Sequence, residues 1–273
     1  MLIAQISDMH IRGPGQKAYR VVETDRYLPP AVQTLNASDP LPDGVIVSGD
    51  LTDFGRSAEY AHLRRMLDGL RMPYYLLAGN HDERVQLAQS FDHLPYLQGT
   101  GEFLQYTIED LPVRLIMLDT VVPKAGHGEL CERRLAWLAD RLAEQPARPT
   151  LLAMHHPPFA TGIGHMDEIG LLRGAQAFEA LVARYPNIER IVCGHLHRTI
   201  FRRFGGTAVS TCPSPAHQVV LDLRPQGPSA FVMEPPGYHL HHWCDGALNT
   251  HHAYIGGYPG PYPFHEDGVL IDE

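Results

Sequence analysis

Five short polar blocks along the chain carry residues that could bind metal ions. They are Asp8-Met9-His10, Gly49-Asp50-Leu51-Thr52-Asp53-Phe54-Gly55, Gly79-Asn80-His81-Asp82, His155-His156-Pro157-Pro158 and Gly194-His195-Leu196-His197. Carboxylates, imidazoles and an amide oxygen suit divalent Mn, Fe, Zn or Co, whereas the thiolates typical of cluster and Cu(I) sites are absent from these blocks. The chain has 17 His against 22 Lys and Arg together, which favours metal ligation or proton transfer.

The order of the blocks is more informative than any one of them. An isolated Asp-x-His or Asn-His-Asp is more often a solvated turn than a site. Here a hydrophobic, strand-like segment precedes every block, and open α/β sheets place ligands just beyond the carboxyl ends of their strands. We therefore expect the blocks to converge on the same edge of a sheet. Two metals held ~3.5 to 4 Å apart need a shared carboxylate, and Asp50 is the natural bridge.

The elements that must position these blocks follow from hydrophobic periodicity. Short aliphatic segments alternate with amphipathic ones through the first two thirds of the chain, which predicts an α/β fold built from βαβ units. The expected strands are residues 2–7, 44–48, 74–78, 114–119, 150–154 and 188–193, and the expected helices are 57–70, 83–92, 131–143 and 174–184. Short strands are expected at 199–204, 207–210, 218–222 and 230–234.

These elements predict a catalytic domain over residues 1–234. Residues 235–273 are rich in Pro, Gly, Tyr and His, so we expect a loop-like arm of the same domain that closes over the site or contacts another subunit. A second metal site in this segment is disfavoured, because the strand-end spacing of the main blocks is not repeated by its histidines, His239, His241, His242, His251, His252 and His265.

Composition excludes several classes of protein. The 273 residues, 44% of them hydrophobic, can bury a sizeable core. The net charge is −9 and no basic run exceeds two residues, which argues against a nucleic-acid or anionic-membrane partner. No apolar segment approaches the ~18 residues of a membrane span, so a cytoplasmic location is expected. Reduced thiols are expected for the four scattered cysteines, Cys131, Cys193, Cys212 and Cys244.

The ordered series of blocks resembles the signature of the calcineurin-like binuclear metallophosphoesterases. Within that superfamily it is similar to the bacterial class III cyclic-nucleotide phosphodiesterases and the related glycerophosphodiesterases. The matching blocks run from residue 8 to residue 197, and the similarity continues through residues 210–217. The resemblance implies a four-layer α-β-β-α sandwich, in which two mixed sheets lie face to face with helices outside.

The resemblance also implies two divalent metal ions (Mn, Fe, Zn or Co) and assigns their ligands. One ion would be held by Asp8, His10 and His197, the other by Asn80, His156 and His195, with Asp50 as the bridge between them. His155, the other member of the adjacent pair, is then expected to pack beside the ligands.

Residues around the metals take further roles in this interpretation. The resemblance places His81 against the phosphate, where it would donate a hydrogen bond or a proton to the leaving alcohol, and Asp82 would orient His81 or its loop. His217 is a candidate substrate contact, with a simple turn histidine as the alternative. Tyr19 could also contact substrate, although an exposed loop tyrosine would look the same in the sequence.

The implied function is hydrolysis of small phosphodiesters, either 3′,5′-cyclic nucleotides or glycerophosphodiesters. Asn80, His81 and Asp50 would act in it directly, with in-line attack by a hydroxide that the two metals hold. A phosphomonoesterase or protein phosphatase of the same superfamily is an alternative, and a non-catalytic metal-binding scaffold is another. A homodimer or a higher homo-oligomer is expected.

Overall fold

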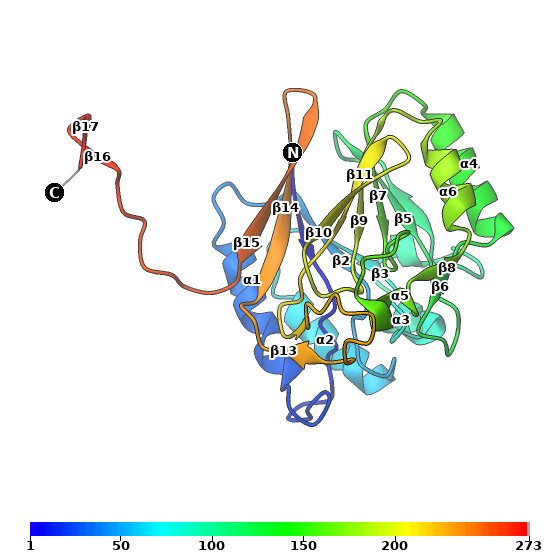
Figure 1. The fold of residues 1–273 in the computed structure, drawn as a ribbon, viewed down its shortest axis with the longest axis horizontal. Coiled ribbons are helices and arrows are strands. Elements are labelled where there is room, and N and C mark those ends of the chain that lie inside the picture. Colours follow the sequence, from blue (N-terminus) through cyan, green and yellow to red (C-terminus); the bar gives the residue numbers. More distant parts are fainter. Residues whose placement is uncertain (272–273) are drawn as a thin grey trace.

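The structure is a computed structural model that describes residues 1–271. Two large mixed sheets lie face to face, with helices on their outer sides (Figure 1). The first sheet has the order β15-β14-β1-β2-β3, formed by Ala247–Tyr254, Gly237–Cys244, Leu2–Ile6, Gly44–Ser48 and Tyr74–Leu77. The second has the order β10-β11-β9-β7-β5-β4, formed by Ile200–Phe204, Thr207–Thr211, Ile188–Cys193, Thr150–Met154, Arg114–Leu118 and Tyr106–Ile108.

Helices cover the outer face of each sheet. Buried side chains of α1 (Leu28–Asn36), α2 (Ser57–Leu67) and α3 (Arg84–Ser90) belong to one core cluster with the first sheet. Those of α4 (Glu132–Glu144) and α6 (Ala175–Val182) belong to a second cluster with the second sheet. The predicted four-layer α-β-β-α sandwich is therefore confirmed. The shorter elements are η1 (Thr24–Arg26), η2 (Pro95–Leu97), α5 (Gly164–Asp167), β6 (Gly128–Glu129), β8 (Leu171–Arg173), β12 (Gln218–Val219), β13 (Phe231–Val232), β16 (His265–Glu266) and β17 (Val269–Leu270).

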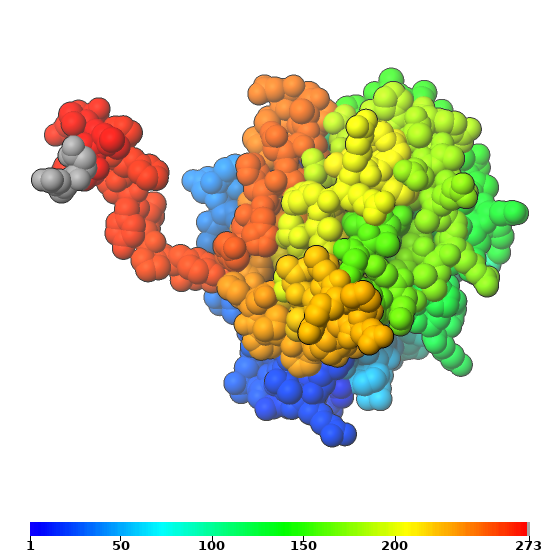
Figure 2. Space-filling model, viewed as in Figure 1, coloured from blue at the N-terminus to red at the C-terminus, as the bar shows by residue number. Residues whose placement is uncertain are grey.

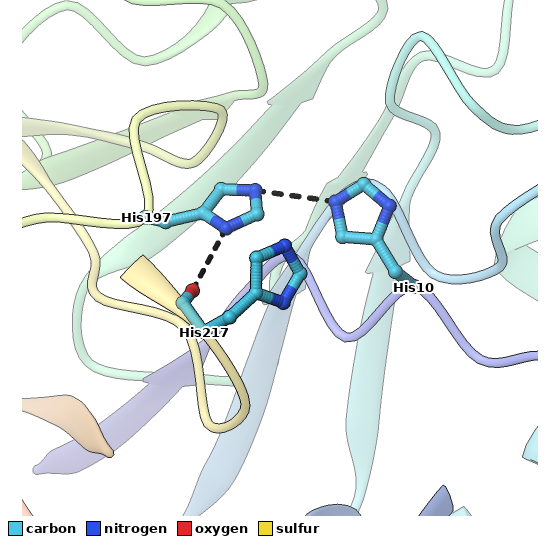
Figure 3. A group of neighbouring side chains, drawn as sticks. All are labelled: His10, His197 and His217. Carbon is cyan, nitrogen blue, oxygen red and sulfur yellow. Dashed lines mark hydrogen bonds between the residues drawn. The ribbon is translucent and has the colours of Figure 1, made fainter. Parts of the chain in front are cut away.

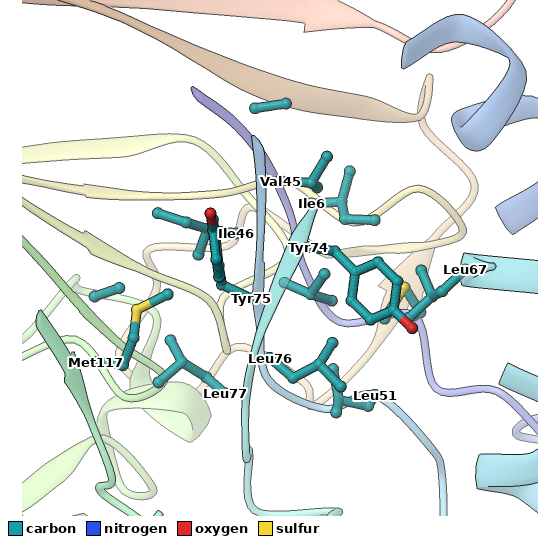
Figure 4. Packing of buried hydrophobic residues seen from close by; sticks show 14 of the residues in the cluster. Ile6, Val45, Ile46, Leu51, Leu67, Tyr74, Tyr75, Leu76, Leu77 and Met117 are labelled. Atoms are coloured by element: carbon teal, nitrogen blue, oxygen red, sulfur yellow. The ribbon is translucent and has the colours of Figure 1, made fainter. Parts of the chain in front are cut away.

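Strand β3 shows how one sheet is buried on both faces. Its side chains alternate, because successive residues of a strand point to opposite sides. Tyr75 and Leu77 point toward Met117 of the second sheet, whereas Leu76 lies on the side of Leu67 from α2 (Figure 4). A continuous apolar strand of this kind is typical of parallel pairing, and β3 pairs in parallel with β2.

The six main predicted strands and the four predicted helices are present, with ends that differ by up to three residues. Helix α1 was not among the predictions. It begins with Leu28 and carries Pro29 and Pro30 in its first turn. Proline is tolerated there because the first amide groups of a helix have no partner within it, but a proline pair in a sequence is typical of a loop.

The prediction of a loop-like arm from residue 235 is wrong for residues 237–254. These residues form the β14–β15 hairpin, and β14 pairs antiparallel with β1 as a full member of the first sheet. His239 and His241 are buried in β14. The strand therefore lacks the alternation of apolar and polar residues by which a half-buried strand is recognised.

Beyond the hairpin, the chain does leave the body of the protein. Residues 256–271 extend away from both sheets and end in the small β16–β17 pair (Figures 1 and 2). Large apolar side chains on this arm are exposed, among them Tyr262 at 75% and Phe264 at 80%. Within residues 1–271, none of the helices has the length and apolar character to cross a membrane.

Candidate active site

The five polar blocks converge in the structure, although on two sheets rather than one. Three blocks follow β1, β2 and β3 of the first sheet, and two follow β7 and β9 of the second. The two sheets face each other, so the carboxyl ends of these strands meet at one end of the sandwich. The expectation of a single sheet edge is corrected in this respect, while the expected meeting of the blocks is confirmed.

Five of the candidate ligands have a left-handed backbone conformation. The φ angles are positive for Asp8 (57°), His10 (46°), Asp50 (46°), His195 (69°) and His197 (48°). Such conformations are unfavourable for residues with a side chain, and they cluster at functional sites where the surrounding structure enforces them. The sharp turn after each strand points the side chain back across the strand ends.

Two glycines allow the blocks to approach one another. A Cβ on Gly79 would lie 2.2 Å from the backbone nitrogen of Asp50, and a Cβ on Gly194 would lie 2.2 Å from Ser7 Oγ and 3.0 Å from Asp8 Oδ2. Any side chain at either position would push the loops apart.

Bonds through Nδ1 fix the orientation of two histidines. His155 Nδ1 donates to the Ser48 carbonyl oxygen over 2.8 Å, and His197 Nδ1 donates to the His217 carbonyl oxygen over 2.9 Å. Since a carbonyl only accepts, Nδ1 carries a proton, and Nε2 is the atom that can offer a lone pair to a metal when the ring is neutral. Histidine ligands of metals are commonly held in this way.

The free Nε2 atoms and the carboxylates face one another across a small space. His10 Nε2 lies 3.1 Å from His197 Nε2 and 3.6 Å from Asp50 Oδ2. His197 Nε2 lies 3.6 Å from Asp8 Oδ1. His155 Nε2 lies 3.4 Å from Asp50 Oδ2 on the other side. Asp50 thus stands between two sets of candidate ligands, the place that a bridging carboxylate would occupy.

His155 and His156 have different hydrogen-bond partners. His155 Nε2 lies 3.1 Å from Asn80 Oδ1 as well as close to Asp50. Both ring nitrogens of His156 have other partners, because Nδ1 lies 2.8 Å from Thr120 Oγ1 and Nε2 lies 3.1 Å from the Gly126 carbonyl oxygen. Both rings belong with His195 to one group of potential ligand atoms, so the choice of the ligand between them stays a prediction.

Electrostatics prepare this site for cations. Burial alone would raise the pKa of Asp50, but His155 and His81 lower it well below its usual range. Burial lowers the pKa of His197 to about 4, so this imidazole is neutral at neutral pH. Burial also lowers the pKa of His155, but Asp50 raises it more, and the result is about 9. Because ligation needs a neutral imidazole, a bound cation would displace a proton from His155.

The residues fit a pair of divalent metals. His195 Nε2 is buried and has no hydrogen-bond partner among the described residues, while the His195 backbone amide donates to Asp8 Oδ1 over 2.9 Å. Unpaired buried imidazole nitrogens are costly unless an ion or water binds them. Potential ligand atoms form four groups, in each of which the atoms lie within 4.8 Å of one another. Two of these groups match the expected pair of sites, one of Asp8, His10 and Asp50, the other of His155, His156 and His195.

His81 lies at the open side of the site, and its side chain is 30% exposed. Its backbone amide donates to Asp50 Oδ1, and its Nδ1 donates to the Asp53 carbonyl oxygen, each over 2.9 Å. The ring packs edge-on against His10, with 4.6 Å between centroids. His81 is therefore beside the ligands and is held by its Nδ1 atom.

Asp53 is a site residue that the sequence reasoning missed. Its Oδ1 lies 3.4 Å from His10 Nδ1 and 3.7 Å from His81 Nδ1, and Arg12 binds its Oδ2 over 2.9 Å. Asp53 sits in the second block, three residues after Asp50, so its spacing was visible. The sequence contained no signal that its carboxylate would reach the first block.

Asp82 orients the loops rather than the His81 ring. Its carboxylate accepts bonds from the Gly79 and Leu51 amides, at 2.9 and 3.0 Å, and from the Tyr60 hydroxyl at 3.0 Å. Burial and the Asp50 charge raise the pKa of Asp82 to about 6. The carboxylate thus connects the loop after β2 to the loop after β3. This agrees with the second of the two expected roles, in which Asp82 orients the loop of His81.

His217 and Tyr19 are both brought to the site. The His217 ring lies 4.7 Å from His197 and 5.5 Å from His10, centroid to centroid, and Figure 3 shows the three imidazoles facing one another. His217 is buried, whereas Tyr19 is 47% exposed and its ring lies 6.2 Å from His10. Both candidate substrate contacts are therefore within reach of a group bound at the metals.

Comparisons with known proteins agree with this geometry. The family model described as Calcineurin-like phosphoesterase matches residues 1–199. A probable glycerophosphodiester phosphodiesterase of Arcobacter nitrofigilis is 39% identical over 274 residues, covering 100% of both chains. A probable cyclic nucleotide phosphodiesterase of Rhodopseudomonas palustris is 37% identical over 241 residues, covering 87% of this chain and 86% of the relative.

Solved structures support the fold. A dimetal phosphatase from Danio rerio superposes with a TM-score of 0.66 at 14% sequence identity, covering 93% of this chain and 99% of that one. This likeness shows the fold, a metallophosphoesterase sandwich. The chain belongs to the calcineurin-like phosphoesterase family, as the match to residues 1–199 shows.

Proposed function

We propose that this protein is a metal-dependent hydrolase of small phosphodiesters, either 3′,5′-cyclic nucleotides or glycerophosphodiesters. The observation that carries the proposal is the arrangement of carboxylates and free imidazole nitrogens on both sides of Asp50. The names of the two relatives divide between these substrate classes, and both describe phosphodiesterases.

Two divalent ions would be held by the strand-end residues. We assign Asp8, His10 and His197 to one ion and Asp50 to both, as the sequence resemblance implies. For the second ion we assign His155 in place of His156, together with Asn80 and His195. When bound, the metals lower the pKa of water and neutralise the charge that develops on the phosphate oxygens. Mn, Fe, Zn and Co share this ligand preference.

His81 would act as the proton donor to the leaving alcohol. Because Nδ1 donates to the Asp53 carbonyl oxygen, Nε2 is the atom left for substrate. From this Nε2 atom His81 would donate a hydrogen bond or a proton to the leaving oxygen while its bond to phosphorus lengthens. Asn80 adds an amide beside the same phosphate, next to His155.

The first test compares two diesters on one preparation. The kcat/KM of the Mn-reconstituted protein is measured for 3′,5′-cyclic AMP and for glycerophosphoethanolamine, with a chelated control. A preference above ~100-fold, about 2.7 kcal/mol of transition-state binding, would assign the substrate class. Comparable values would indicate a generalist. Turnover that is absent for both, or unaffected by the chelator, would contradict the proposal. Faster turnover of a phosphomonoester would favour the monoesterase alternative.

A homo-oligomer is the assembly we propose. The arm over residues 256–271 carries apolar side chains that the body of the chain leaves exposed, including Phe264 at 80% and Val269 at 69%. Two-stranded pairs such as β16–β17 are marginally stable alone, so a second copy of the chain is the partner that would cover them. A monomer in light scattering would contradict this. The cytoplasmic location stays a prediction, which cell fractionation would test.

A further inference from the structure

An aromatic cluster lies at the mouth of the site. The ring of Tyr19 is 5.4 Å from the ring of His217 and 5.4 Å from that of Phe231, and the rings of His217 and Phe231 are 5.2 Å apart. Phe231 was not singled out in the sequence. These centroid distances are those of interacting aromatic pairs. His217 connects the cluster to the metal site through its contact with His197.

Tyr19 occupies the cluster at a cost in backbone energy. It lies in a tight turn in which Tyr19 and Arg20 have φ angles of 50° and 63°. Ala18 and Val22 close the turn with two backbone hydrogen bonds, of 2.8 and 3.0 Å. Successive positive φ angles in a tight turn are normally supplied by Asn and Gly. A tyrosine there is strained, and such strain is typical of positions kept for function.

Phe231 and His217 reach the cluster on a single segment. Phe231 pairs with Val219 in the β12–β13 ladder, which begins directly after His217. The residues between the two strands form a lobe on the face shown in Figure 2, with Leu221 exposed at 61%. The strained turn and the β12–β13 hairpin are far apart in the sequence of the catalytic domain. The rings of Tyr19 and Phe231 nevertheless meet beside the candidate metal ligands.

We propose that Tyr19 and Phe231, supported from behind by the buried ring of His217, form a stacking subsite for a planar aromatic group attached to the phosphate. This inference rests on the proposed function, because the metals would fix the phosphate beside His10 and His197. A group joined to that phosphate through a sugar would then meet the aromatic rings. A nucleobase offers a face for stacking, whereas glycerol does not, so the subsite selects nucleotide diesters over glycerophosphodiesters.

Binding calorimetry on the Mn-loaded full chain tests the subsite without requiring turnover. The probes are adenosine 5′-monophosphate and ribose 5-phosphate, which share phosphate and sugar and differ in the base. We expect the nucleotide to bind the unchanged protein ~5- to 100-fold more tightly. Phe231→Ala should reduce this ratio to below ~3-fold while leaving the affinity for ribose 5-phosphate unchanged. Tyr19→Leu, on an exposed turn, provides a second variant, in which the ratio of the two affinities should fall in the same way.

Phe201→Ala is the matched control, because Phe201 is also exposed, at 54%, but lies on β10. It should leave both affinities unchanged. Equal binding of the two probes to the unchanged protein would overturn the inference. An equal loss of affinity for both probes in the Phe231 and Tyr19 variants would also overturn the inference, since the rings would then only support the metal site. Inorganic phosphate serves as a third probe. If it fails to bind the Mn-loaded protein, the proposed function is contradicted. If the nucleotide fails to bind as well, the stacking subsite is also contradicted.

Discussion

Two regions of this protein are rich in buried histidine, and only one is arranged to hold metals. At the strand ends, His10, His155 and His197 present free nitrogens to the carboxylates of Asp8 and Asp50. In strand β14 of the hairpin, the buried histidines His239 and His241 lie on the same face of the sheet, with 5.9 Å between their rings. The difference lies in what surrounds each ring.

The hairpin histidines have neutral partners. His239 Nε2 lies 3.0 Å from Thr199 Oγ1, and His241 Nε2 lies 3.1 Å from Gln5 Oε1. Burial lowers the pKa of His239 to about 3, so the ring stays neutral. No carboxylate joins these rings in any group of potential ligands within residues 1–271. Histidine density alone therefore does not make a metal site, and the carboxylate at the strand end is the deciding component.

The largest difference between the two histidine-rich regions is expected when the shared carboxylate is removed. Asp50→Asn takes away the charge that both cations would share, so metal content should fall for both ions and turnover should fall to the level of the chelated protein. Elemental analysis together with kcat provides the measurement. Asp245→Asn is the matched control, because Asp245 has a similar φ angle, 52° against 46° for Asp50, and lies in the hairpin turn. Unchanged metal content in Asp50→Asn would remove the bridging assignment.

Substitution of His81 distinguishes the loss of proton transfer from the loss of metal binding at the strand-end site. His81→Ala should keep both metals, because its ring nitrogens face Asp53 and the open side rather than the ligand groups around Asp50. Turnover should fall ~10²- to 10⁴-fold, the usual contribution of a general acid. Stopped-flow or steady-state kcat on the metal-replete variant checks this. A wild-type kcat would exclude His81 from the chemistry.

The adjacent histidines His155 and His156 can be substituted one at a time, and each variant is the control for the other. His155→Ala should lose the ion bound beside Asn80, whereas His156→Ala should retain both ions and lose mainly packing and two hydrogen bonds. We expect at least ~10-fold lower kcat/KM for His155→Ala than for His156→Ala, as for other losses at metal sites. Metal content is measured on both variants side by side. The reverse order would restore the assignment drawn from the sequence.

The smallest effect on chemistry is expected in the hairpin. His241→Gln removes a buried ring that bonds Gln5 and Thr250, so the free energy of unfolding should fall by ~1 to 3 kcal/mol. Metal content and kcat should stay within ~2-fold, because surface and packing changes far from the ligands act mainly on stability. Thermal unfolding and elemental analysis are the measurements. Loss of metal in this variant would show that the hairpin histidines belong to a metal site.

Much of the site could be predicted because its ligands follow strands that periodicity reveals. The blocks after β1, β2, β3, β7 and β9 were visible as polar residues behind apolar segments. Two features escaped for physical reasons. Asp53 acts across loops, and β14 buries histidines, so neither follows a hydrophobic pattern.

The position of β1 between β14 and β2 has a consequence for synthesis of the protein. β1 leaves the ribosome long before β14, yet β14, residues 237–244, is one of its two neighbours. The backbone oxygen of Trp243 accepts a bond from the amino terminus itself, across a separation of 242 positions. Long-range strand pairing of this kind slows folding, so the sheet that carries Asp8 and Asp50 is completed only after residues 237–244 have been synthesised. A nascent chain halted before residue 237 would hold every metal ligand and still have an open edge beside its first strand.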